Sequence, residues 1–516
     1  MAILDAIGDL LEAYSVTYVH LLVGGLVIYG TTLMLYRLFF SPISHLPGSI
    51  LSRTSMSYMR VMTVLGKLPD MCEDDYYKYG DIYVVAPDIV TLSNPADCRT
   101  VMGSHAFVKD KFYEAFELID ETIFTTKDAD FNHMRRRQIG PAFTQGSLQS
   151  MEPTIMECGV LAIKKKWDKL IGDYRGSAKI NYSLDFSLTT FDVISALGYG
   201  QRFHALENNK SKIVNWVVWY NWLAILKAAI PSITEFPLSL ISRPLLKSRK
   251  EFVDFGNAAA EHRREQIRQG QKVPNDILQA LIDGEDPESK AKMTPSQVTA
   301  ENIGILIGGT DTTSLTMTWT LHYLMLYPEC YRKAVEEVRS VFAPDHLIGY
   351  SEGRSQLPYV EACIYESMRI RAVSGVILPR VVPPGGATFQ GHFIPAGKTI
   401  GVNVAGMNHH QSLWKDSKRF MPERFIDNPK LKQQVMTFST GVRICPGRAL
   451  AWIEMITIFA NLLKDYDFSL PEGALYGPDK TDKSGLPVVM PRTHALTVGP
   501  KNPERDCNVI VTKRVL

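Results

Sequence analysis

The pattern of hydrophobic and polar positions divides the chain into an apolar N-terminal run and a long, mostly helical remainder. Residues 16–36 contain no Asp, Glu, Lys or Arg. A helix over this run would be roughly 30 Å long at 1.5 Å per residue, which is enough to cross a bilayer once. A buried core helix is the alternative, but the length and uniformity of the run favour a membrane anchor.

The charges on either side of this run predict how it is oriented. Residues 1–15 carry three acidic side chains and no Lys or Arg, unlike the basic start of a cleaved signal peptide. Basic residues follow the run, beginning with Arg37. Because the positive side faces the cytosol, we expect a lumenal N-terminus over 1–15, a single-pass anchor over 16–36 in the endoplasmic reticulum membrane, and a cytosolic body. Two prolines in residues 41–48 predict a stiff hinge over 37–50.

The remaining residues, 51–516, indicate one domain. Residues 79–85 and 89–93 predict two short strands, and from about residue 95 the pattern becomes helical for most of the chain. Residues 389–400 predict a hairpin and residues 485–492 another short strand region, whereas nothing is predicted after residue 500. With no internal repeat, the pattern favours a single, mainly α domain with a small β portion.

The most clearly marked helix begins after Thr294 and runs to about residue 326. Thr294 and Gln297 have the spacing of a capping box, with proline at the first helical position. Residues 308–309 inside it are both glycine, which costs a helix about 1 kcal/mol each relative to alanine. Such a cost indicates a ligand pressed against the backbone or a local widening of the helix. A simple kink is the alternative.

Composition narrows the function. The chain is 45% hydrophobic and 21% charged with a net charge of +2, which gives no reason to expect a nucleic-acid partner. Its seven cysteines are scattered and include no Cys-x-x-Cys pair, which argues against a disulfide framework or zinc site and for a reducing compartment. There is no Gly-x-Gly-x-x-Gly dinucleotide fingerprint.

The most distinctive stretch is residues 438–450, which hold one cysteine in a glycine loop ahead of an apolar helix pattern. Cys445 lies between Gly441 and Gly447, with Arg443 two residues before it and Phe438 at the start. Glycine lets the backbone turn and approach a flat cofactor closely, and a helix N-terminus stabilises a thiolate. An isolated cysteine in a turn is ordinarily a buried free thiol, but here Phe, Gly, Arg, Cys and Gly stand together at fixed offsets, a combination that chance would seldom produce in a chain of this length.

This loop, Phe-x-x-Gly-x-Arg-x-Cys-x-Gly, resembles the haem-binding loop of the cytochrome P-450 family. The resemblance covers roughly residues 40–498, and further motifs occur in the family's order. These are a basic helix at 133–137, Gly-Gly-x-Asp-Thr at 308–312, Glu366-x-x-Arg369, and Pro-Glu-Arg-Phe containing Arg424. The resemblance implies a cytochrome P-450-type fold preceded by one transmembrane helix.

The resemblance also implies roles for individual residues around a haem. Cys445 would be the axial thiolate ligand of the iron, whose electron density favours cleavage of dioxygen. The haem propionates would be bound by four side chains, namely Arg443, Arg380, Arg137 and His133. His133 stands where most members carry tryptophan, and a run of arginines is otherwise usually a solvated helix face.

Two further groups are implied on either side of the haem. Asp311 and Thr312 would organise water and deliver protons to bound oxygen. Glu366, Arg369 and Arg424 would form a buried charged triad that steadies the cysteine loop, although an isolated Glu-x-x-Arg pair on a helix is weak evidence.

The activity implied is that of a haem-thiolate monooxygenase using dioxygen on a hydrophobic small molecule. NADPH would supply electrons indirectly, through a membrane-bound flavin reductase. A looser similarity to fungal members suggests natural-product biosynthesis, with a terpenoid, polyketide or alkaloid substrate. A haem-thiolate isomerase or dehydratase that does not use dioxygen is one alternative, against which the Asp311–Thr312 pair argues. A non-catalytic haem sensor is another.

The candidate substrate pocket is mostly apolar and comes from four stretches, residues 112–124, 306–309, 374–378 and 486–489. Within the first, Glu114, Glu117 and Asp120 would contact a basic or hydroxylated group, or else be solvated. Residues 213–245 contain three tryptophans and a long apolar stretch. They predict either a core helix pair or, by analogy with anchored family members, a lid-like pair that touches the bilayer.

Overall fold

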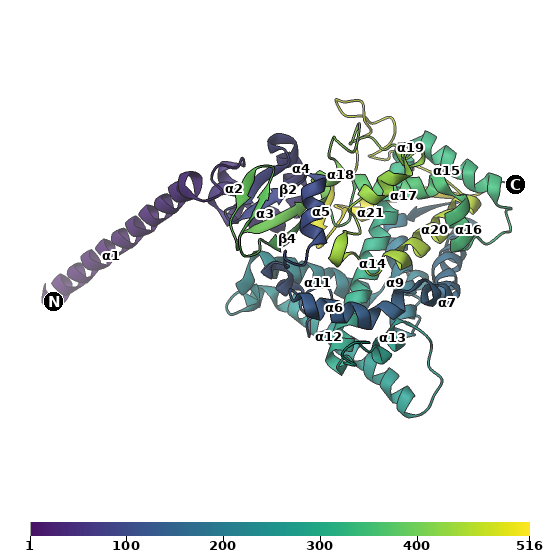
Figure 1. Ribbon diagram of the computed structural model, residues 1–516, viewed down its shortest axis with the longest axis horizontal. Helices are drawn as coiled ribbons and strands as arrows, with labels where there is room; N and C mark the ends of the chain where they lie inside the picture. Colours follow the sequence, from purple (N-terminus) through teal and green to yellow (C-terminus); the bar gives the residue numbers. More distant parts are fainter. Residues whose placement is uncertain (1, 516) are drawn as a thin grey trace.

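The computed structural model describes residues 2–515, with side chains from residue 18 onward. Helix α1 (Ala2–Leu35) leads into the π-helical turn η1 (Tyr36–Phe40) and projects away from the body (Figure 1). The stretch Tyr18–Phe40 is long and apolar enough to cross a membrane, and none of it is buried against the rest of the chain. It overlaps most of the predicted anchor, whereas the acidic side chains of residues 1–15 lie outside the described side chains.

The segment after α1 is tied to the body by two arginines. Arg37 donates to the backbone carbonyl of Thr54 at 2.6 Å, and Arg53 donates to the carbonyls of Leu38 and Ser44. The proline-containing turns at the predicted hinge are thereby held against α2 (Ile50–Thr54), so that the helix and the body are joined by a braced connection.

A four-stranded sheet forms the β part next to α1. Strands β1 (Ile82–Ala86) and β2 (Ile89–Leu92) make an antiparallel hairpin, as predicted. Strand β2 then pairs in parallel with β7 (Thr399–Asn403), which pairs antiparallel with β4 (Ile377–Val381). The pairing brings residues some 300 positions apart in sequence into one sheet and carries Arg380 into the interior.

Smaller sheets complete the β portion. The predicted hairpin is formed by β5 (Ala387–Phe389) and β6 (His392–Ile394). The strand predicted at 485–492 is wrong: that stretch makes only an isolated bridge, and the regular strands follow it as β9 (Arg492–Ala495) and β10 (Thr497–Pro500). The C-terminus, where nothing was predicted, supplies β11 (Asn508–Lys513), the central strand between β3 (Ser177–Asn181) and β8 (Tyr466–Ser469).

Most of the body is helical, as predicted, and the helices surround the central α14 (Pro295–Leu326) (Figure 1). The other helices of the body are α3 (Met56–Val64), α4 (Leu68–Tyr79), α5 (Pro95–Gly103), η2 (Lys111–Phe116), α6 (Ala129–Ile139), η3 (Gly140–Phe143), α7 (Gln145–Ile155), η4 (Met156–Leu161), α8 (Ala162–Asp173), α9 (Tyr182–Tyr199), α10 (Ala205–Asn208), α11 (Lys212–Ala229), η5 (Pro231–Thr234), α12 (Ser239–Arg268), α13 (Ile277–Asp283), α15 (Pro328–Val341), α16 (Tyr350–Gln356), α17 (Pro358–Ile370), α18 (Val404–Asn408), α19 (Glu423–Asp427), η6 (Pro429–Gln434), η7 (Gly441–Arg443), α20 (Arg448–Asp465) and α21 (Pro503–Asp506).

Helix α14 begins with the predicted capping box, in which Thr294 and Gln297 satisfy each other's backbone N–H groups. It remains α-helical throughout, so the local widening expected at its glycines is absent. Gly308 is exposed with no atom near the position of a Cβ, whereas a Cβ on Gly309 would lie 2.6 Å from Ile194 of α9. One glycine therefore faces an open space and the other permits a close helix crossing.

Candidate active site

The loop before α20 presents the Cys445 sulfur to the interior. The backbone N–H of Cys445 donates to the carbonyl of Phe438 at 3.0 Å, which closes the loop. Gly441 has φ +66°, and a Cβ there would lie 2.4 Å from the carbonyl oxygen of Met102, so only glycine fits. Among the seven free cysteines, only Cys445 is exposed, although it lies deep within the protein. A sulfur that is both deep and accessible lines an internal space.

Nearby N–H groups and a guanidinium make the Cys445 thiolate more favourable than it would be if burial acted alone. Burial raises the pKa of the Cys445 thiol, while backbone N–H groups of Gly447 and Arg448 and the Arg136 guanidinium oppose the rise. These are the first amides of α20, where the helix dipole also favours a negative charge.

A cluster of cations lies beside the loop without an anion to balance it. Arg136, Arg380, Arg443 and Lys109 interact repulsively, and no ion pair joins any of them to a carboxylate among the described side chains. Burial, followed by Arg380 and Arg136, lowers the pKa of Arg443 to about 10, and Arg443 Nη1 is buried without a hydrogen-bond partner. Buried cations that lack a partner are costly, so this cluster fits an acidic ligand.

The structure places Arg137 in ion pairs with two acidic residues, so its role at the propionates stays a prediction. Its guanidinium pairs with Asp286, 2.5 Å from Nε to Oδ1, and with Glu288, on the side of α6 away from the cationic cluster. The preceding residue, Arg136, donates to the carbonyl of Ile444 at 2.7 Å, next to Cys445. The buried face of α6 contains Asn132, Arg135, Gln138 and Ile139, so the sequence alone does not single out Arg136.

His133 lies against another histidine, and its role at the propionates also stays a prediction. Its exposed imidazole packs on that of His105, with ring centroids 5.1 Å apart, and has no contact with the cationic cluster. Two residues that the sequence did not single out lie at the cluster instead. Lys109 is almost fully buried, and the hydroxyl of Tyr113 accepts a hydrogen bond from Arg380 Nη1 at 3.0 Å.

On α14, the side chains of Asp311 and Thr312 form hydrogen bonds with different partners. Thr312 Oγ1 donates to the carbonyl of Gly308 at 2.6 Å, which satisfies the hydroxyl within the helix. The carboxylate of Asp311 accepts a hydrogen bond from Asn221 Nδ2 of α11 at 2.7 Å. Burial raises the pKa of Asp311 to about 6, and the bond from Asn221 limits that rise. The acid is thus close to its own titration point at neutral pH but is turned toward α11.

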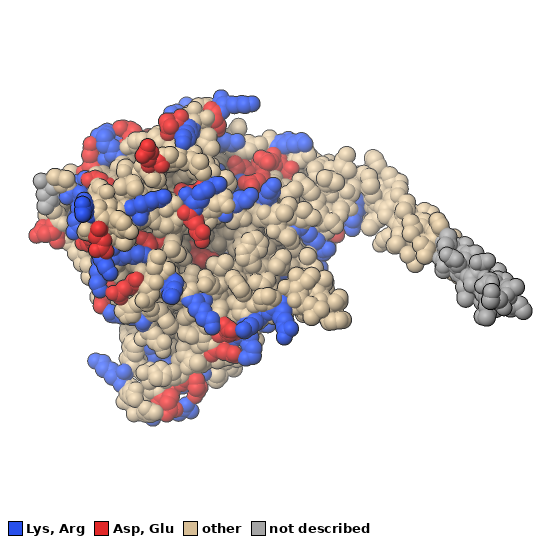
Figure 2. Space-filling view, turned by 180° about the vertical axis from the view of Figure 1, so that it is seen from behind, with Lys and Arg blue, Asp and Glu red and all other residues tan. Residues whose placement is uncertain are grey.

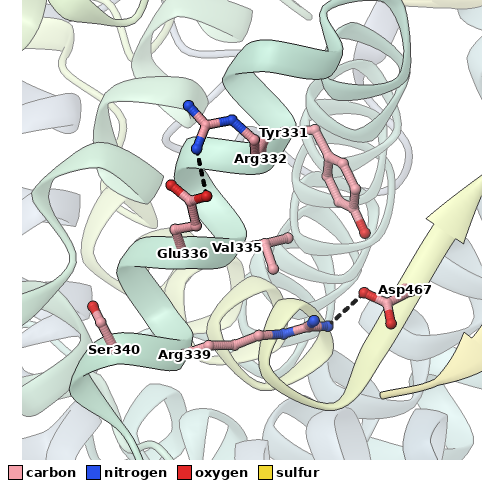
Figure 3. Close-up of a pocket in the computed structure, with 7 residues that line it drawn as sticks. All are labelled: Tyr331, Arg332, Val335, Glu336, Arg339, Ser340 and Asp467. Atoms are coloured by element: carbon pink, nitrogen blue, oxygen red, sulfur yellow. Dashed lines mark hydrogen bonds and ion pairs between the residues drawn. The ribbon is translucent and has the colours of Figure 1, made fainter. Parts of the chain in front are cut away.

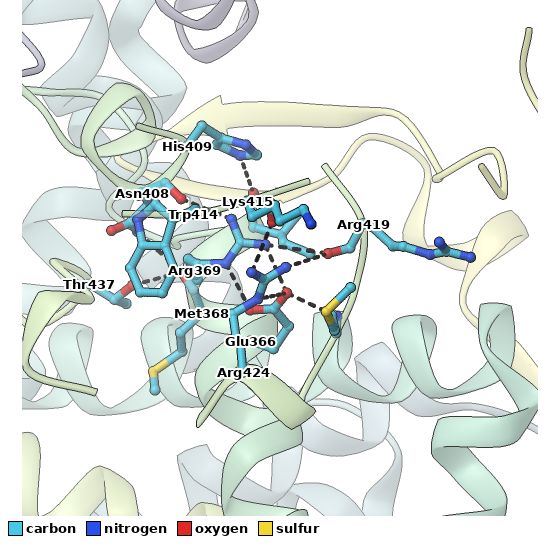
Figure 4. A network of polar contacts seen from close by, with 12 residues as sticks. Glu366, Met368, Arg369, Asn408, His409, Trp414, Lys415, Arg419, Arg424 and Thr437 are labelled. Atoms are coloured by element: carbon cyan, nitrogen blue, oxygen red, sulfur yellow. Dashed lines mark hydrogen bonds and ion pairs between the residues drawn. The ribbon is translucent and has the colours of Figure 1, made fainter. Parts of the chain in front are cut away.

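The expected charged triad is present and fully buried (Figure 4). Arg369 donates two hydrogen bonds, of 2.7 and 2.8 Å, to the Glu366 carboxylate. Arg424 Nε donates to Glu366 Oε1 at 3.0 Å. The network extends toward the cysteine loop, because Arg369 donates to the carbonyl of Asn408 and Asn408 accepts from the N–H of Met436. The triad thereby fixes the chain that leads into residues 438–450.

A groove on the outer surface lies apart from these groups (Figure 3). It has a volume of about 590 Å³ and is lined by α15 and the start of β8, with ion pairs Arg332–Glu336 and Arg339–Asp467 across it. Arg339 also donates to the carbonyl of Leu463 at the C-terminal end of α20. Since α20 is roughly 27 Å long, the groove lies far from Cys445 and does not belong to the site.

Comparison with known proteins decides the family. The family model described as cytochrome P450 matches residues 60–496. The chain belongs to the cytochrome P450 family. Cytochrome P450 monooxygenase helB1 of Aspergillus fumigatus is 42% identical over 487 residues, covering 93% of this chain and 84% of that protein. Cytochrome P450 monooxygenase helB2 of the same fungus is 39% identical, covering 93% and 96%.

The fold agrees with this membership. The crystal structure of the cytochrome P450DA heme domain superposes with a TM-score of 0.73 at 16% identity, covering 87% of this chain and 94% of that one. As a cytochrome P450, the chain is a haem-thiolate monooxygenase that uses dioxygen and a hydrophobic substrate and receives electrons from NAD(P)H through a reductase. The accessible Cys445 sulfur and the unbalanced cations are the features that a dianionic haem would require.

Proposed function

We propose that this cytochrome P450 is a membrane-anchored enzyme that oxidises a hydrophobic natural product, with haem held between the Cys445 loop and α14. The observation that carries the proposal is the position of Cys445 beside Arg136, Arg380 and Arg443, a thiol next to one buried and two half-buried guanidinium groups that form no ion pair among the described side chains. Haem when bound supplies the activation of dioxygen. The residues of the chain hold it, exclude water and move protons.

Cys445 would ligate the iron, and the backbone N–H groups of Gly447 and Arg448 would stabilise its thiolate. Arg443, Arg380 and Arg136 would bind the propionates, and the same arginines together with burial lower the pKa of the neighbouring Lys109 well below its usual value. Phe438, Gly441 and Gly447 shape the loop, Gly441 through its approach to Met102. Glu366, Arg369 and Arg424 would act only by holding this loop in place.

On the opposite side, Thr312 and Asp311 would handle protons. Gly308 leaves α14 open at the turn whose carbonyl accepts from Thr312. A water at this turn would have the Thr312 hydroxyl as a hydrogen-bond partner, and Asp311 with its pKa of about 6 would be able to give up or take up a proton near neutral pH.

The surroundings support a hydrophobic substrate. Phe112, Phe116 and Phe124 form a cluster of edge-to-face contacts at 5.1–5.8 Å with Tyr113, next to the cationic cluster. Glu114 pairs with Lys127 on the exposed side, as expected for a solvated acid. Similarity to fungal monooxygenases, including poxM of Penicillium oxalicum at 26% identity, supports a role in natural-product biosynthesis, and we propose a terpenoid, polyketide or alkaloid as the substrate.

Membrane attachment rests on the apolar stretch Tyr18–Phe40. The excess of basic residues after it supports a body in the cytosol, and the endoplasmic reticulum is the membrane where this orientation arises during insertion. The electron donor would be a membrane-bound flavin reductase that uses NADPH, because the chain lacks a dinucleotide-binding motif of its own.

The decisive experiment is the spectrum of the reduced protein with carbon monoxide. We expect the strongly red-shifted Soret band of thiolate-ligated haem, and we expect Cys445→Ser to lose it while haem content falls. A wild-type band without the shift would refute the Cys445 assignment. Incorporation of labelled oxygen from dioxygen into product, with candidate substrates chosen by the spin-state shift that they cause, then tests the oxidation itself.

A further inference from the structure

The partner of Asp311 is an amide from a different helix. Asn221 of α11 is 2% exposed, and its Nδ2 donates to Asp311 Oδ2 at 2.7 Å. The other end of the same amide, Oδ1, is buried and has no hydrogen-bond partner. A buried carbonyl oxygen that lacks a donor is unfavourable, and this one belongs to the same amide that binds the Asp311 carboxylate.

A carboxyl group and an amide are complementary in both protonation states of the acid. When the acid is ionised, the amide N–H donates one charge-assisted bond. When the acid is protonated, its O–H is a donor, and the amide oxygen is the acceptor that would receive it. The unpartnered Oδ1 of Asn221 therefore fits a protonated Asp311, and Nδ2 fits either form.

The charged groups on the neighbouring helices are engaged with other partners. On α9, Asp192 accepts from the backbone N–H of Ala205 and Leu206, and Asp185 pairs with Lys166.

On α11, Lys227 donates to the carbonyl of Glu114 and Lys212 pairs with Glu251 of α12. On the same α12, Arg249 donates to the carbonyl of Leu118. Within the part of the chain that the structure describes, burial and the Asn221 bond are the influences on Asp311, and no charged side chain acts on it. An arginine or lysine here would hold the carboxyl ionised, whereas an amide leaves it free to change state.

We propose that Asn221 is a positioning residue for proton delivery, whose amide holds the Asp311 carboxyl in place whether it is ionised or protonated. Asp311 then takes a proton from water, keeps it in an O–H bond directed at Asn221 Oδ1, and releases it to water at the Thr312 turn without leaving its place on α14. Because Asn221 belongs to α11, this pair also ties that helix to the centre of the site. The inference deepens the proposed function and rests on it.

Infrared difference spectroscopy of the holoprotein tests the pair directly. The carbonyl stretch of protonated Asp311 is identified by its loss in Asp311→Asn, and its intensity is followed with pH. We expect Asn221→Leu, which has nearly the same size, to raise the midpoint by about one pH unit or more, because the charge-assisted bond to the ionised acid that it removes is stronger than the neutral bond to the protonated acid. We expect Asn221→Gln, which keeps both amide groups, to stay near the wild type. Asn215→Leu, on the exposed side of α11, is the matched control.

A second measurement follows the fraction of NADPH electrons that appear as hydrogen peroxide, as a function of pH. We expect this profile to move with the infrared midpoint in Asn221→Leu. An unmoved infrared midpoint would overturn the role of Asn221. A moved midpoint with an unmoved profile would instead remove Asp311 from proton delivery. Loss of the red-shifted carbon monoxide band in the wild type would refute the haem-thiolate site itself, independently of both.

Discussion

At the level of single residues, three consecutive arginines on one helix turn have three different roles. Arg135 is fully buried and pairs with Glu301 of α14 at 3.2 Å, Arg136 reaches the Cys445 loop, and Arg137 pairs with Asp286. Successive helix positions are rotated by about 100°, so neighbours in sequence face different partners. The role of an arginine in such a run is decided by its face, and only the structure fixes which face meets the cofactor.

This difference gives a matched pair of variants. We expect Arg136→Ala to lower the haem bound per polypeptide several-fold, because it removes a cation from the cluster and the hydrogen bond to Ile444. Arg137→Ala should keep the haem content and lower only stability, by about 1 kcal/mol or less for a partly exposed ion pair. Haem measured per polypeptide after purification, alongside urea unfolding, separates the two. Equal haem loss in both variants would contradict the assignment.

A buried histidine provides a pH prediction. His322 of α14 accepts a hydrogen bond from the N–H of Met490 at 3.2 Å, and burial lowers its pKa to about 3. In the unfolded chain, histidine takes up a proton below about pH 6.5. Since the unfolded state then binds more protons at this position, the folded state loses stability as pH falls from about 6.5 toward 3.

We expect His322→Gln to remove this contribution. The difference in unfolding free energy between wild type and variant should shift by about 2 kcal/mol in favour of the variant between pH 7 and pH 5. Urea unfolding of both proteins at each pH measures it. A constant difference across this range would show that His322 is not held neutral in the folded protein.

At the level of elements, the two glycines of α14 have opposite surroundings. A Cβ on Gly309 would lie 2.6 Å from Cγ1 and 3.2 Å from Cβ of Ile194, where no side-chain rotation relieves the clash. We expect Gly309→Ala to destabilise the fold by about 1–3 kcal/mol through overpacking, and Ile194→Ala to relieve part of this in the double variant. Gly308→Ala should keep or raise stability, by up to about 1 kcal/mol, while changing the spectral response to ligands. Thermal unfolding and ligand titrations distinguish these outcomes.

The buried triad of Glu366, Arg369 and Arg424 connects α17 to α19. Glu366 is fully buried and balances Arg369 and Arg424. Glu366→Gln would leave both guanidinium groups buried without a full counter-charge, so we expect a loss of about 3–5 kcal/mol and of bound haem. Glu361 lies less than two turns away on α17 and pairs with the partly exposed Lys432 and Arg354. Glu361→Gln is therefore the control, and comparable damage from it would contradict a special role for the triad.

The elements that the sequence predicted are those with strong local signals. The capping box indicated the start of α14, two short strand-like runs on either side of a proline-containing turn indicated β1 and β2, and glycines marked the β5–β6 hairpin. The order of motifs singled out Glu366, Arg369 and Arg424, which ion pairs join in the structure, and the ligand role of Cys445 stays a prediction. Strand β11 was missed because its strand character comes from pairing with β3 and β8, far away in sequence. Asn221 was missed for the same reason: nothing near it in sequence points to Asp311.

At the level of the whole molecule, exposed apolar side chains gather on the flank from which α1 leaves. One group comes from α2, α3 and the end of α3, and consists of Ile50, Leu51, Val61 and Leu65. The other comes from the segment between α11 and the first turn of α12, and consists of Phe236, Leu240 and Ile241. Helix α3 packs against α11, so the two groups are neighbours. Figure 2 shows this flank as mostly tan, whereas charged side chains cover much of the remaining face.

Continuity with the apolar stretch Tyr18–Phe40 makes a bilayer the surface that this flank fits. Phe236 is 82% exposed and Ile241 is 75% exposed, so their contact with water is unfavourable by about 25 cal/mol per Å² of apolar surface. A protein without residues 1–40 should therefore still bind vesicles. The substrate-side helices α11 and α12 would then lie at the membrane, where a hydrophobic substrate is dissolved.

The test is vesicle flotation of the protein lacking residues 1–40. We expect that protein to float with the vesicles, and Phe236→Ser with Ile241→Ser to shift it to the soluble fraction, because two large apolar contacts are lost while the fold is untouched. Phe393→Ser with Leu475→Ser removes exposed apolar side chains elsewhere and should leave flotation unchanged. A truncated protein that stays soluble would show that α1 alone attaches the enzyme. Equal effects of the two double variants would show that the protein adsorbs to vesicles non-specifically, without a defined membrane-facing flank.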